Sequence, residues 1–227
     1  MGVTKSGPAS LALSWSGGKD SALALRALRV EHGVEPQALV TTVTSSYNRI
    51  SMHGVRRSLL RRQAGALGLP LVEVTIPPGC TNMVYEERWT DAFASSRLEG
   101  AEEVAFGDLF LEDVRRYRED LLARAGKRGV FPLWGRDTAT LAREFVASGF
   151  RAVLVCVDPE QLDGSFAGRE YDEGLLADLP AAVDPCGERG EFHTFVYAGP
   201  GFPTPVSCRV GDVVERDGFV FCDLDVD

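Results

Sequence analysis

Short apolar runs alternate with stretches of helical periodicity through the first half of the chain. Strands are predicted at Leu11–Trp15, Ala38–Thr44, Leu69–Ile76 and Val104–Phe106. Helices are predicted at Ala22–Leu28, Gly54–Gly68, Asn82–Leu98 and Leu111–Arg124. Strands that alternate with helices of this length indicate parallel βαβ units, with helices on both faces of the sheet. We therefore expect an open α/β sheet.

The pattern changes beyond Gly126-Lys127-Arg128-Gly129, which we interpret as a hinge. The elements predicted after it are strands at Phe131–Leu133 and Phe150–Val157, helices at Thr138–Ser148 and Tyr171–Leu179, and strands at Glu191–Tyr197, Pro205–Glu215 and Phe219–Leu224. The last two strands flank Arg216-Asp217-Gly218, a hairpin signal. We expect two domains, residues 1–128 with the parallel sheet and residues 129–227 with a smaller α+β arrangement.

The composition does not alter the expected fold, but it argues against some classes of binding partner. The chain of 227 residues is 44% hydrophobic and carries a net charge of −9. A surplus of carboxylates opposes binding to nucleic acid, so Arg56, Arg57, Arg61 and Arg62 are interpreted as a solvated helix face. No apolar run approaches the roughly 20 residues that span a bilayer, so we expect no membrane partner.

The cysteines and histidines carry no metal-site signature. The five cysteines include no CxxC pair, and the three histidines are scattered, so no zinc site is predicted. An odd cysteine count without a secretory signal favours reduced thiols and a cytoplasmic protein.

The segment Ser16-Gly17-Gly18-Lys19-Asp20-Ser21 has the chemistry of a phosphate-binding loop. The two glycines let backbone N–H groups approach an anion, and the helix that follows adds unpaired donors and a partial positive charge. Lys19 adds a full charge, and the hydroxyls of Ser16 and Ser21 add donors. Asp20 fits beside Mg²⁺ or as a helix cap. The bland alternative is a plain Gly-Gly turn between strand and helix.

Two other phosphate loops do not match. The Walker A loop requires a glycine where this chain has Leu13, and Ser or Thr where it has Asp20. The GxGxxG dinucleotide pattern is absent from this segment as well.

SGGKDS is the signature of the PP-loop ATP pyrophosphatases, and later segments make the chain resemble the diphthine–ammonia ligase family in a bacterial-type form. The segments that carry this resemblance are residues 52–56 (MHGVR), 107–115 (GDLFLEDVR), 132–136 (PLWGR), 168–172 (GREYD) and 184–194 (DPCGERGEFHT). The resemblance implies an N-terminal adenine-nucleotide domain of the Rossmann-like HUP type, a family-specific C-terminal domain, and an active cleft between them. One segment departs from the family pattern, because Arg189 replaces a glycine and His193 replaces a glutamate. This difference bears on the acceptor rather than on nucleotide chemistry.

The predicted activity is an amide ligation that uses ATP and Mg²⁺. ATP adenylates a carboxylate-bearing acceptor with release of pyrophosphate, and ammonia or an amine then displaces AMP. Lys19, Asp108, Glu188, Glu191 and His193 are the catalytic candidates. Ser16–Ser21, His53 and Arg56 are the candidate ATP ligands, and Asp20 is the candidate metal ligand. A homodimer is left open.

The carboxylates and His193 are assigned to the acceptor side by strand alternation. Glu191 and His193 share one strand face, and Phe192 and Thr194 share the other. Because Phe192 is a natural core residue, we expect Glu191 and His193 to point into the cleft. The alternative is an exposed strand face.

Two other activities stay open. A protein of this fold could sense ATP or AMP without making an amide. Cys186 with His193 could also form a nucleophile–base pair for tRNA thiolation, with Cys80 as the second thiol.

Overall fold

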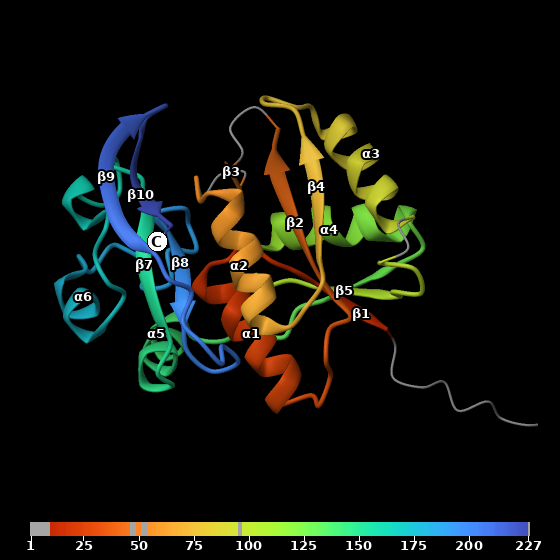
Figure 1. The fold of residues 1–227 in the computed structure, drawn as a ribbon, viewed down its shortest axis with the longest axis horizontal. Coiled ribbons are helices and arrows are strands. Elements are labelled where there is room, and N and C mark those ends of the chain that lie inside the picture. Colours follow the sequence, from red (N-terminus) through yellow and green to blue (C-terminus); the bar gives the residue numbers. More distant parts are fainter. Residues whose placement is uncertain (1–9, 46–48, 51–53, 95–96, 227) are drawn as a thin grey trace, which may run out of the picture.

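The computed structural model describes residues 10–45, 49–50, 54–94 and 97–226. Within them, two sheets form the frameworks of two domains that lie side by side (Figure 1). The first sheet holds five parallel strands in the order β4-β2-β1-β5-β6 and a two-residue antiparallel strand, β3, beside the end of β2. Its strands are β1 (Leu11–Ser14), β2 (Ala38–Thr44), β3 (Arg49–Ile50), β4 (Leu71–Ile76), β5 (Glu103–Ala105) and β6 (Arg128–Val130).

Helices cover both faces of this sheet, as the alternation of the first half predicts. The bounds of the helices are α1 (Lys19–Val30), α2 (Arg57–Leu67), α3 (Asn82–Phe93) and α4 (Glu112–Arg124). Leu11 and Leu13 of β1 pack in the hydrophobic cluster that includes α1 and α2, whereas Ala12 between them packs with residues of α3 and α4. The two-residue period of the strand therefore separates the two cores. The predicted Rossmann-like open parallel sheet is confirmed.

The second domain is built on an antiparallel sheet in the order β8-β7-β10-β9. Its elements are α5 (Thr138–Ala147), β7 (Arg151–Val157), the short 3-10 helix η1 (Gly164–Phe166), α6 (Glu173–Asp178), β8 (Phe192–Ala198), β9 (Arg209–Arg216) and β10 (Phe219–Asp225). The predicted hairpin is present, because β9 and β10 pair on either side of Asp217 and Gly218, both with positive φ. The predicted smaller α+β arrangement is confirmed.

The region of the predicted hinge differs from the expectation. The strand expected at Phe131–Leu133 is wrong, and the strand lies instead at Arg128–Val130, paired in parallel with β5. Sequence periodicity cannot detect a three-residue edge strand whose side chains are exposed or half-buried. The boundary between residues 128 and 129 stays a prediction, and it falls inside β6.

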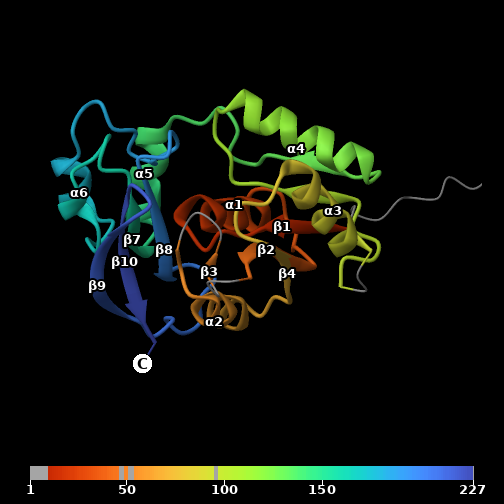
Figure 2. The same cartoon turned by 90° about the horizontal axis from the view of Figure 1, so that it is seen from above.

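The two domains share one core. The hydrophobic cluster on the α1 and α2 side of the parallel sheet continues into residues of β7, β8 and α5. Figure 2 shows α1 between the parallel sheet and β8. Since α1 follows the SGGKDS loop directly, this packing brings β8 and the loop before it against the phosphate-loop candidate.

Candidate active site

The SGGKDS loop leaves the carboxyl end of β1 and begins α1. In the strand order, β2 lies on one side of β1 and β5 on the other, and the chain reaches β5 only after β2 and β4. Open α/β sheets bind ligands at such a switch point, in the crevice outside the carboxyl ends of the strands. The loop therefore occupies the position where this fold places a ligand.

A cavity of about 480 Å³ lies at this point. Three segments of the chain contribute its walls: the loop after β1, the β5–α4 connection with α4, and the loop that leads into β8. The lining residues are Ser14, Ser16, Gly18–Ser21, Phe106–Asp108, Leu111, Val114, Arg118, Gly187–Gly190 and Phe192–Thr194. Both domains thus form one site, which is the arrangement that the family resemblance implies.

Backbone and hydroxyl hydrogen bonds hold the SGGKDS loop against β8. The N–H of Val196 donates to the carbonyl of Gly17 at 2.9 Å, and the N–H of Lys19 donates to the hydroxyl of Thr194 at 3.0 Å. Within the loop, the hydroxyl of Ser21 donates to the carbonyl of Gly18 at 2.8 Å. Thr194 is a site residue that the sequence interpretation placed on the core face, because strand alternation does not show which face the other domain covers.

The side chain of Lys19 is buried at the contact between the domains, where it is 2% exposed. Its ammonium donates to the Cys186 carbonyl and forms an ion pair of 2.9 Å with Asp20. Burial is the largest single influence and would lower the pKa of Lys19, but the charge and hydrogen bond of Asp20, together with Cys186 and Glu188, outweigh burial and the pKa is raised. Lys19 therefore stays positively charged and contributes its charge to the cavity while it joins the two domains.

Asp108 and Arg118 form an ion pair of 2.7 Å in the cavity wall. Burial raises the pKa of Asp108, and the Arg118 guanidinium opposes that shift. The guanidinium also lies over the Phe106 ring, 4.4 Å from its centroid. Sequence reasoning missed Arg118, because nothing in the pattern of α4 distinguishes this half-buried arginine from the other arginines of the helix.

The residue before Asp108 must be small. A Cβ on Gly107 would lie 2.8 Å from the carbonyl carbon of Asp20, which is closer than real Cβ contacts allow. The β5–α4 connection therefore passes directly over the start of α1. This close approach sets Asp108 beside the SGGKDS loop.

The pKa of the Glu188 carboxyl is shifted toward neutrality in the site. Its pKa is raised to about 7, chiefly by burial, and the charges of Asp20 and Asp108 act in the same direction. The backbone N–H of Leu109 and the charge of Lys19 oppose the shift. A carboxyl with a pKa near neutrality can accept and release a proton at physiological pH. Glu188 is thus equipped for acid–base chemistry.

Glu191 does not line the cavity, and the expectation that it points into the cleft is wrong. Its side chain is 2% exposed, and its two carboxylate oxygens accept backbone N–H bonds from Asp184 and Arg189, each at 2.9 Å. Strand alternation failed here because β8 begins at Phe192, so Glu191 belongs to the preceding loop. Glu191 closes that loop on itself.

The cavity is lined by residues from both predicted faces of the strand: His193 from one face, and Phe192 and Thr194 from the other. Phe192 is buried, as expected for a core residue. β8 enters the site at its first residues, where a shift of register against β7 near Cys156 interrupts regular pairing. His193 therefore reaches the site from the C-terminal domain, as predicted.

Of the two ATP candidates after β2, His53 lies outside the described residues. Arg56 lies outside the cavity lining and forms ion pairs with Asp223 at 2.5 Å and Asp225 at 3.2 Å, both in β10. In this structure Arg56 connects α2 with the second sheet. Its predicted phosphate contact requires those ion pairs to open.

The thiol of Cys186 is poorly suited to nucleophilic chemistry. It is 1% exposed, and the thiol donates to the Thr138 carbonyl at 3.3 Å. Burial raises its pKa to about 12, so the thiol is protonated at neutral pH. Since the thiolate is the nucleophile in thiol chemistry, this environment argues against the thiolation alternative.

Trp134 and Arg136, in the segment 132–136 that carries part of the family resemblance, lie away from this cavity. Arg136 pairs with Glu144 at 2.6 Å, and Trp134 packs against Arg115. Neither residue lines the cavity.

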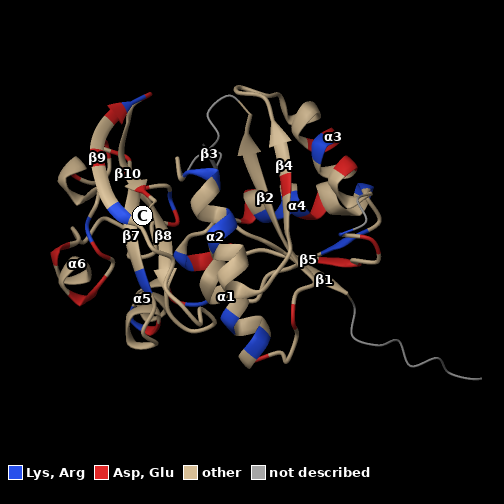
Figure 3. Ribbon diagram, viewed as in Figure 1, with Lys and Arg blue, Asp and Glu red and all other residues tan. Residues whose placement is uncertain are grey.

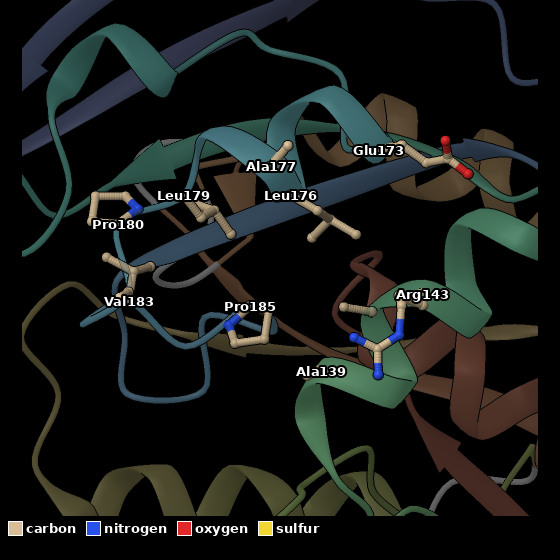
Figure 4. A pocket seen from close by; sticks show the side chains of 11 residues that line it. Ala139, Arg143, Glu173, Leu176, Ala177, Leu179, Pro180, Val183 and Pro185 are labelled. Atoms are coloured by element: carbon tan, nitrogen blue, oxygen red, sulfur yellow. The ribbon is translucent and has the colours of Figure 1, made fainter.

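A second cavity of about 460 Å³ lies between α5, α6 and the segment that ends at Pro185 (Figure 4). The labelled side chains are mostly aliphatic, with Arg143 and Glu173 at one end. It shares no lining residue with the cavity at the SGGKDS loop. An apolar lining does not suit a triphosphate, so the second cavity is not part of the nucleotide site.

Charge is mixed over both domains rather than collected on one. Figure 3 shows acidic and basic segments interspersed along the ribbon. Arg57 and Arg61 of the arginine-rich helix both pair with Glu73, at 2.8 Å for Arg61. This agrees with the interpretation of α2 as a solvated face rather than a nucleic-acid grip. No helix in the described part of the chain is long and apolar enough to cross a bilayer.

Fold and site together define a PP-loop nucleotide-binding protein with a second domain that completes the site. A family model for the diphthamide synthase N-terminal domain matches residues 9–129, and one for the diphthamide synthase C-terminal domain matches residues 137–216. The chain belongs to the diphthamide synthase family.

Curated relatives agree with this assignment. The chain is 29% identical over 129 residues to diphthine–ammonia ligase of Schizosaccharomyces pombe, with 55% of the chain and 21% of the relative covered. It is 30% identical over 174 residues to the Rattus norvegicus ligase, with 70% and 65% covered, and 31% identical over 156 residues to the Danio rerio ligase, with 61% and 60% covered. The aligned part is thus about a fifth of the yeast relative and under two thirds of the two others.

One solved structure resembles the chain at lower identity. It is titled as the crystal structure of a predicted subunit of tRNA methyltransferase from Methanocaldococcus jannaschii, with 18% identity and a TM-score of 0.41. The similarity covers 83% of this chain and 96% of the other.

Proposed function

We propose that the protein is an ATP-dependent amide ligase that forms AMP and pyrophosphate. It adenylates the carboxylate of an acceptor, and ammonia or an amine then attacks the acyl-adenylate. The observation that carries this proposal is the single cavity in which the SGGKDS loop meets Glu188 and His193 of the C-terminal domain. One part of the site suits phosphate, and the other suits proton transfer from an amine.

The SGGKDS loop supports the first step by electrostatics. Carboxylate oxygen is a poor leaving group, and attachment of AMP makes it a good one. Negative charge develops on the departing pyrophosphate, and prearranged donors stabilise it without reorganisation. The N-terminal end of α1, the hydroxyl of Ser16 and the ammonium of Lys19 are the groups that this chain supplies; the first N–H of α1, that of Lys19, already donates to Thr194.

The second step needs a proton acceptor, and Glu188 is placed to be that group. Ammonia that attacks an acyl-adenylate becomes a cationic adduct, which must lose a proton as AMP departs. Deprotonated Glu188 accepts this proton, and its pKa of about 7 matches the task. His193 lines the same cavity, and we assign it to the acceptor side.

The described residues do not form a dedicated magnesium site. No group of three or more His, Cys, Asp or Glu side chains among them is arranged to hold a metal ion. The carboxylate of Asp20, the predicted ligand, pairs with Lys19. We therefore assign Mg²⁺ to the triphosphate of ATP itself.

Product analysis tests the proposal directly. ATP labelled at the α-phosphate is incubated with the protein, an ammonium salt and a carboxylate acceptor. A protein that carries diphthine is one acceptor to test, because the relatives are named diphthine–ammonia ligases. We expect labelled AMP together with pyrophosphate and the new amide. Labelled ADP would contradict the proposal. Tight ATP binding with no turnover, whichever acceptor is supplied, would instead favour a protein that senses ATP or AMP.

A further inference from the structure

Gln63 of α2 is a fully buried polar residue at the contact between the two domains, with an exposed fraction of 0%. Its side-chain nitrogen donates to the carbonyls of Gly17 at 2.9 Å and Val196 at 2.5 Å. Its side-chain oxygen accepts from the indole N–H of Trp15 at 2.9 Å. All its polar atoms are therefore satisfied by groups around the SGGKDS loop.

The orientation of this amide is fixed by chemistry. The indole of Trp15 can only donate, so the atom of Gln63 that faces it must be the oxygen. The nitrogen then faces two carbonyl groups, which can only accept. Any reversal of the amide would break three hydrogen bonds in a buried place, where unpaired polar groups are costly.

The bond to the Gly17 carbonyl also orients the N–H group of Gly18, which belongs to the same peptide. The carbonyl of Gly17 and the N–H of Gly18 belong to one planar trans peptide, so they point in opposite directions. The carbonyl points toward Gln63 and Val196. The N–H of Gly18 points toward the hydroxyl of Ser16 at 3.3 Å, and both residues line the cavity.

Nothing in Gly17 itself keeps the peptide in this orientation. Its φ is +80°, a region that glycine enters freely, and glycine tolerates the rotations that turn a peptide over. A Cβ at this position would lie 2.8 Å from the Gln63 oxygen, so glycine is also required for the close contact.

We propose that Gln63 is a positioning residue for the phosphate loop. It holds the Gly17–Gly18 peptide with its carbonyl turned toward Gln63 and Val196 and its N–H on the side of Ser16, where a phosphate can replace the long bond to the Ser16 hydroxyl. Without this donor, the Val196 N–H is the remaining partner of the Gly17 carbonyl, and the carbonyl turns more easily toward the anion, which it repels. This inference rests on the proposed use of the loop to bind the phosphates of ATP.

Gln63→Glu and Gln63→Met together form the test. An ionised carboxylate keeps the shape and the bond from Trp15 but cannot donate to Gly17, and methionine has no donor in any protonation state. We expect the affinity for ATP and for inorganic pyrophosphate to fall about tenfold or more, whereas adenosine, which has no phosphate, binds within about twofold of wild type. Calorimetry with the three ligands separates these effects. Gln37→Glu is the control, since Gln37 also donates to a backbone carbonyl, that of Arg97, outside the cavity.

The backbone amide of Gly18 gives a readout that does not depend on ligand. In ¹⁵N-labelled protein we expect its resonance to shift or double in Gln63→Glu and in Gln63→Met, and to stay unchanged in Gln37→Glu. Unchanged pyrophosphate affinity, an unchanged Gly18 amide, or an equal loss of adenosine binding would overturn the role of Gln63. Wild-type protein that binds neither ATP nor pyrophosphate would instead overturn the proposed function.

Discussion

The carboxylate of Glu188 accepts a hydrogen bond of 2.8 Å from the backbone N–H of Leu109. This bond joins the loop before β8 to the connection after β5, so it spans the two domains at the rim of the cavity. It also holds the carboxyl of a residue from one domain beside Asp108 from the other. Repulsion between such groups contributes to the raised pKa of Glu188.

Glu188→Gln should slow amide formation strongly and leave ATP affinity within a few fold. The amide oxygen of glutamine keeps the bond from Leu109 but cannot take a proton from the attacking amine. General bases typically contribute about 10²–10⁴-fold to a rate, and we expect a loss of that size. In wild type, compared at a constant concentration of unprotonated ammonia, the rate should rise through about pH 7 as Glu188 loses its proton. A variant that keeps this rise would show that another group is the base.

The same variant should be more stable than wild type above neutrality. The pKa of Glu188 is about 7 when folded and near 4.5 when unfolded, so between these values the folded state binds the extra proton. The free energy of unfolding therefore falls as pH rises through this window, and the Glu188→Gln protein, which has no carboxyl to ionise there, escapes that loss. Denaturant titrations at about pH 5 and about pH 8 should show a gap between the two proteins that widens with pH.

Lys19→Ala should lower ATP affinity about ten- to 150-fold, because a hydrogen bond to a charged group contributes about 1.5–3 kcal/mol. It should also cost stability, since the Cys186 carbonyl loses its buried donor. Lys127→Ala is the matched control: Lys127 donates to the Ala101 carbonyl and lies over an aromatic ring, that of Phe93, outside the cavity. Calorimetry should show equal ATP affinity for the control and wild type. A similar loss in both variants would remove Lys19 from the phosphate site.

Periodicity predicted the strands and helices of the parallel sheet well, because each buries a stripe or a face whose period is visible in the sequence. The strand β2 matches its predicted bounds, Ala38–Thr44. β6 and β3 were not predicted, because two or three residues cannot show a period and their pairing is decided by neighbouring strands.

Some parts of the site could be predicted from the sequence and others could not, depending on how far apart the interacting residues lie along the chain. The SGGKDS loop carries its chemistry in adjacent residues, so local pattern suffices. Arg118, Thr194 and Gln63 act on partners 10, 175 and 46 residues away in sequence, and only the fold brings them together. Glu191 was misplaced because its orientation depends on where β8 begins, and element boundaries are the least certain part of a pattern.

Cys186→Ser should retain most of the ligase activity. The hydroxyl can donate to the Thr138 carbonyl as the thiol does, and the proposed chemistry needs no sulfur. In native wild type we expect iodoacetamide to modify the half-buried Cys80 and Cys208 but not Cys186, whose pKa is about 12. Mass spectrometry after digestion identifies the labelled positions. Rapid labelling of Cys186, or loss of activity in a folded variant, would revive the thiolation alternative.

Arg56→Ala should leave ATP affinity within about threefold, because the guanidinium is committed to Asp223 and Asp225 rather than to the cavity. Partly exposed ion pairs contribute about 0.2–1 kcal/mol, so the free energy of unfolding should fall by a similar amount, and less at high salt. Calorimetry and denaturant titration measure the two effects. A tenfold loss of ATP affinity would show that Arg56 leaves β10 to bind phosphate, as the sequence suggested.

Glu191→Gln should act on the loop before β8 rather than on the chemistry. The two carboxylate oxygens of Glu191 each accept one backbone N–H, from Asp184 and Arg189. Glutamine offers one oxygen and an amide nitrogen that cannot accept, so one of these N–H groups loses its partner in a buried place. An unsatisfied buried group costs about 1–3 kcal/mol, and we expect a loss of stability of this size.

The contrast with Glu188→Gln separates support of the loop from catalysis. In Glu191→Gln the loop that carries Glu188 becomes less ordered, so ATP affinity and the rate of amide formation should fall together and modestly. The pH at which the rate rises should stay near 7, because Glu188 remains the proton acceptor. In Glu188→Gln the rate alone falls, and its rise with pH disappears. If Glu191→Gln instead abolished the rate with unchanged stability and unchanged ATP affinity, Glu191 would touch the reacting groups, and its assignment to loop support would be wrong.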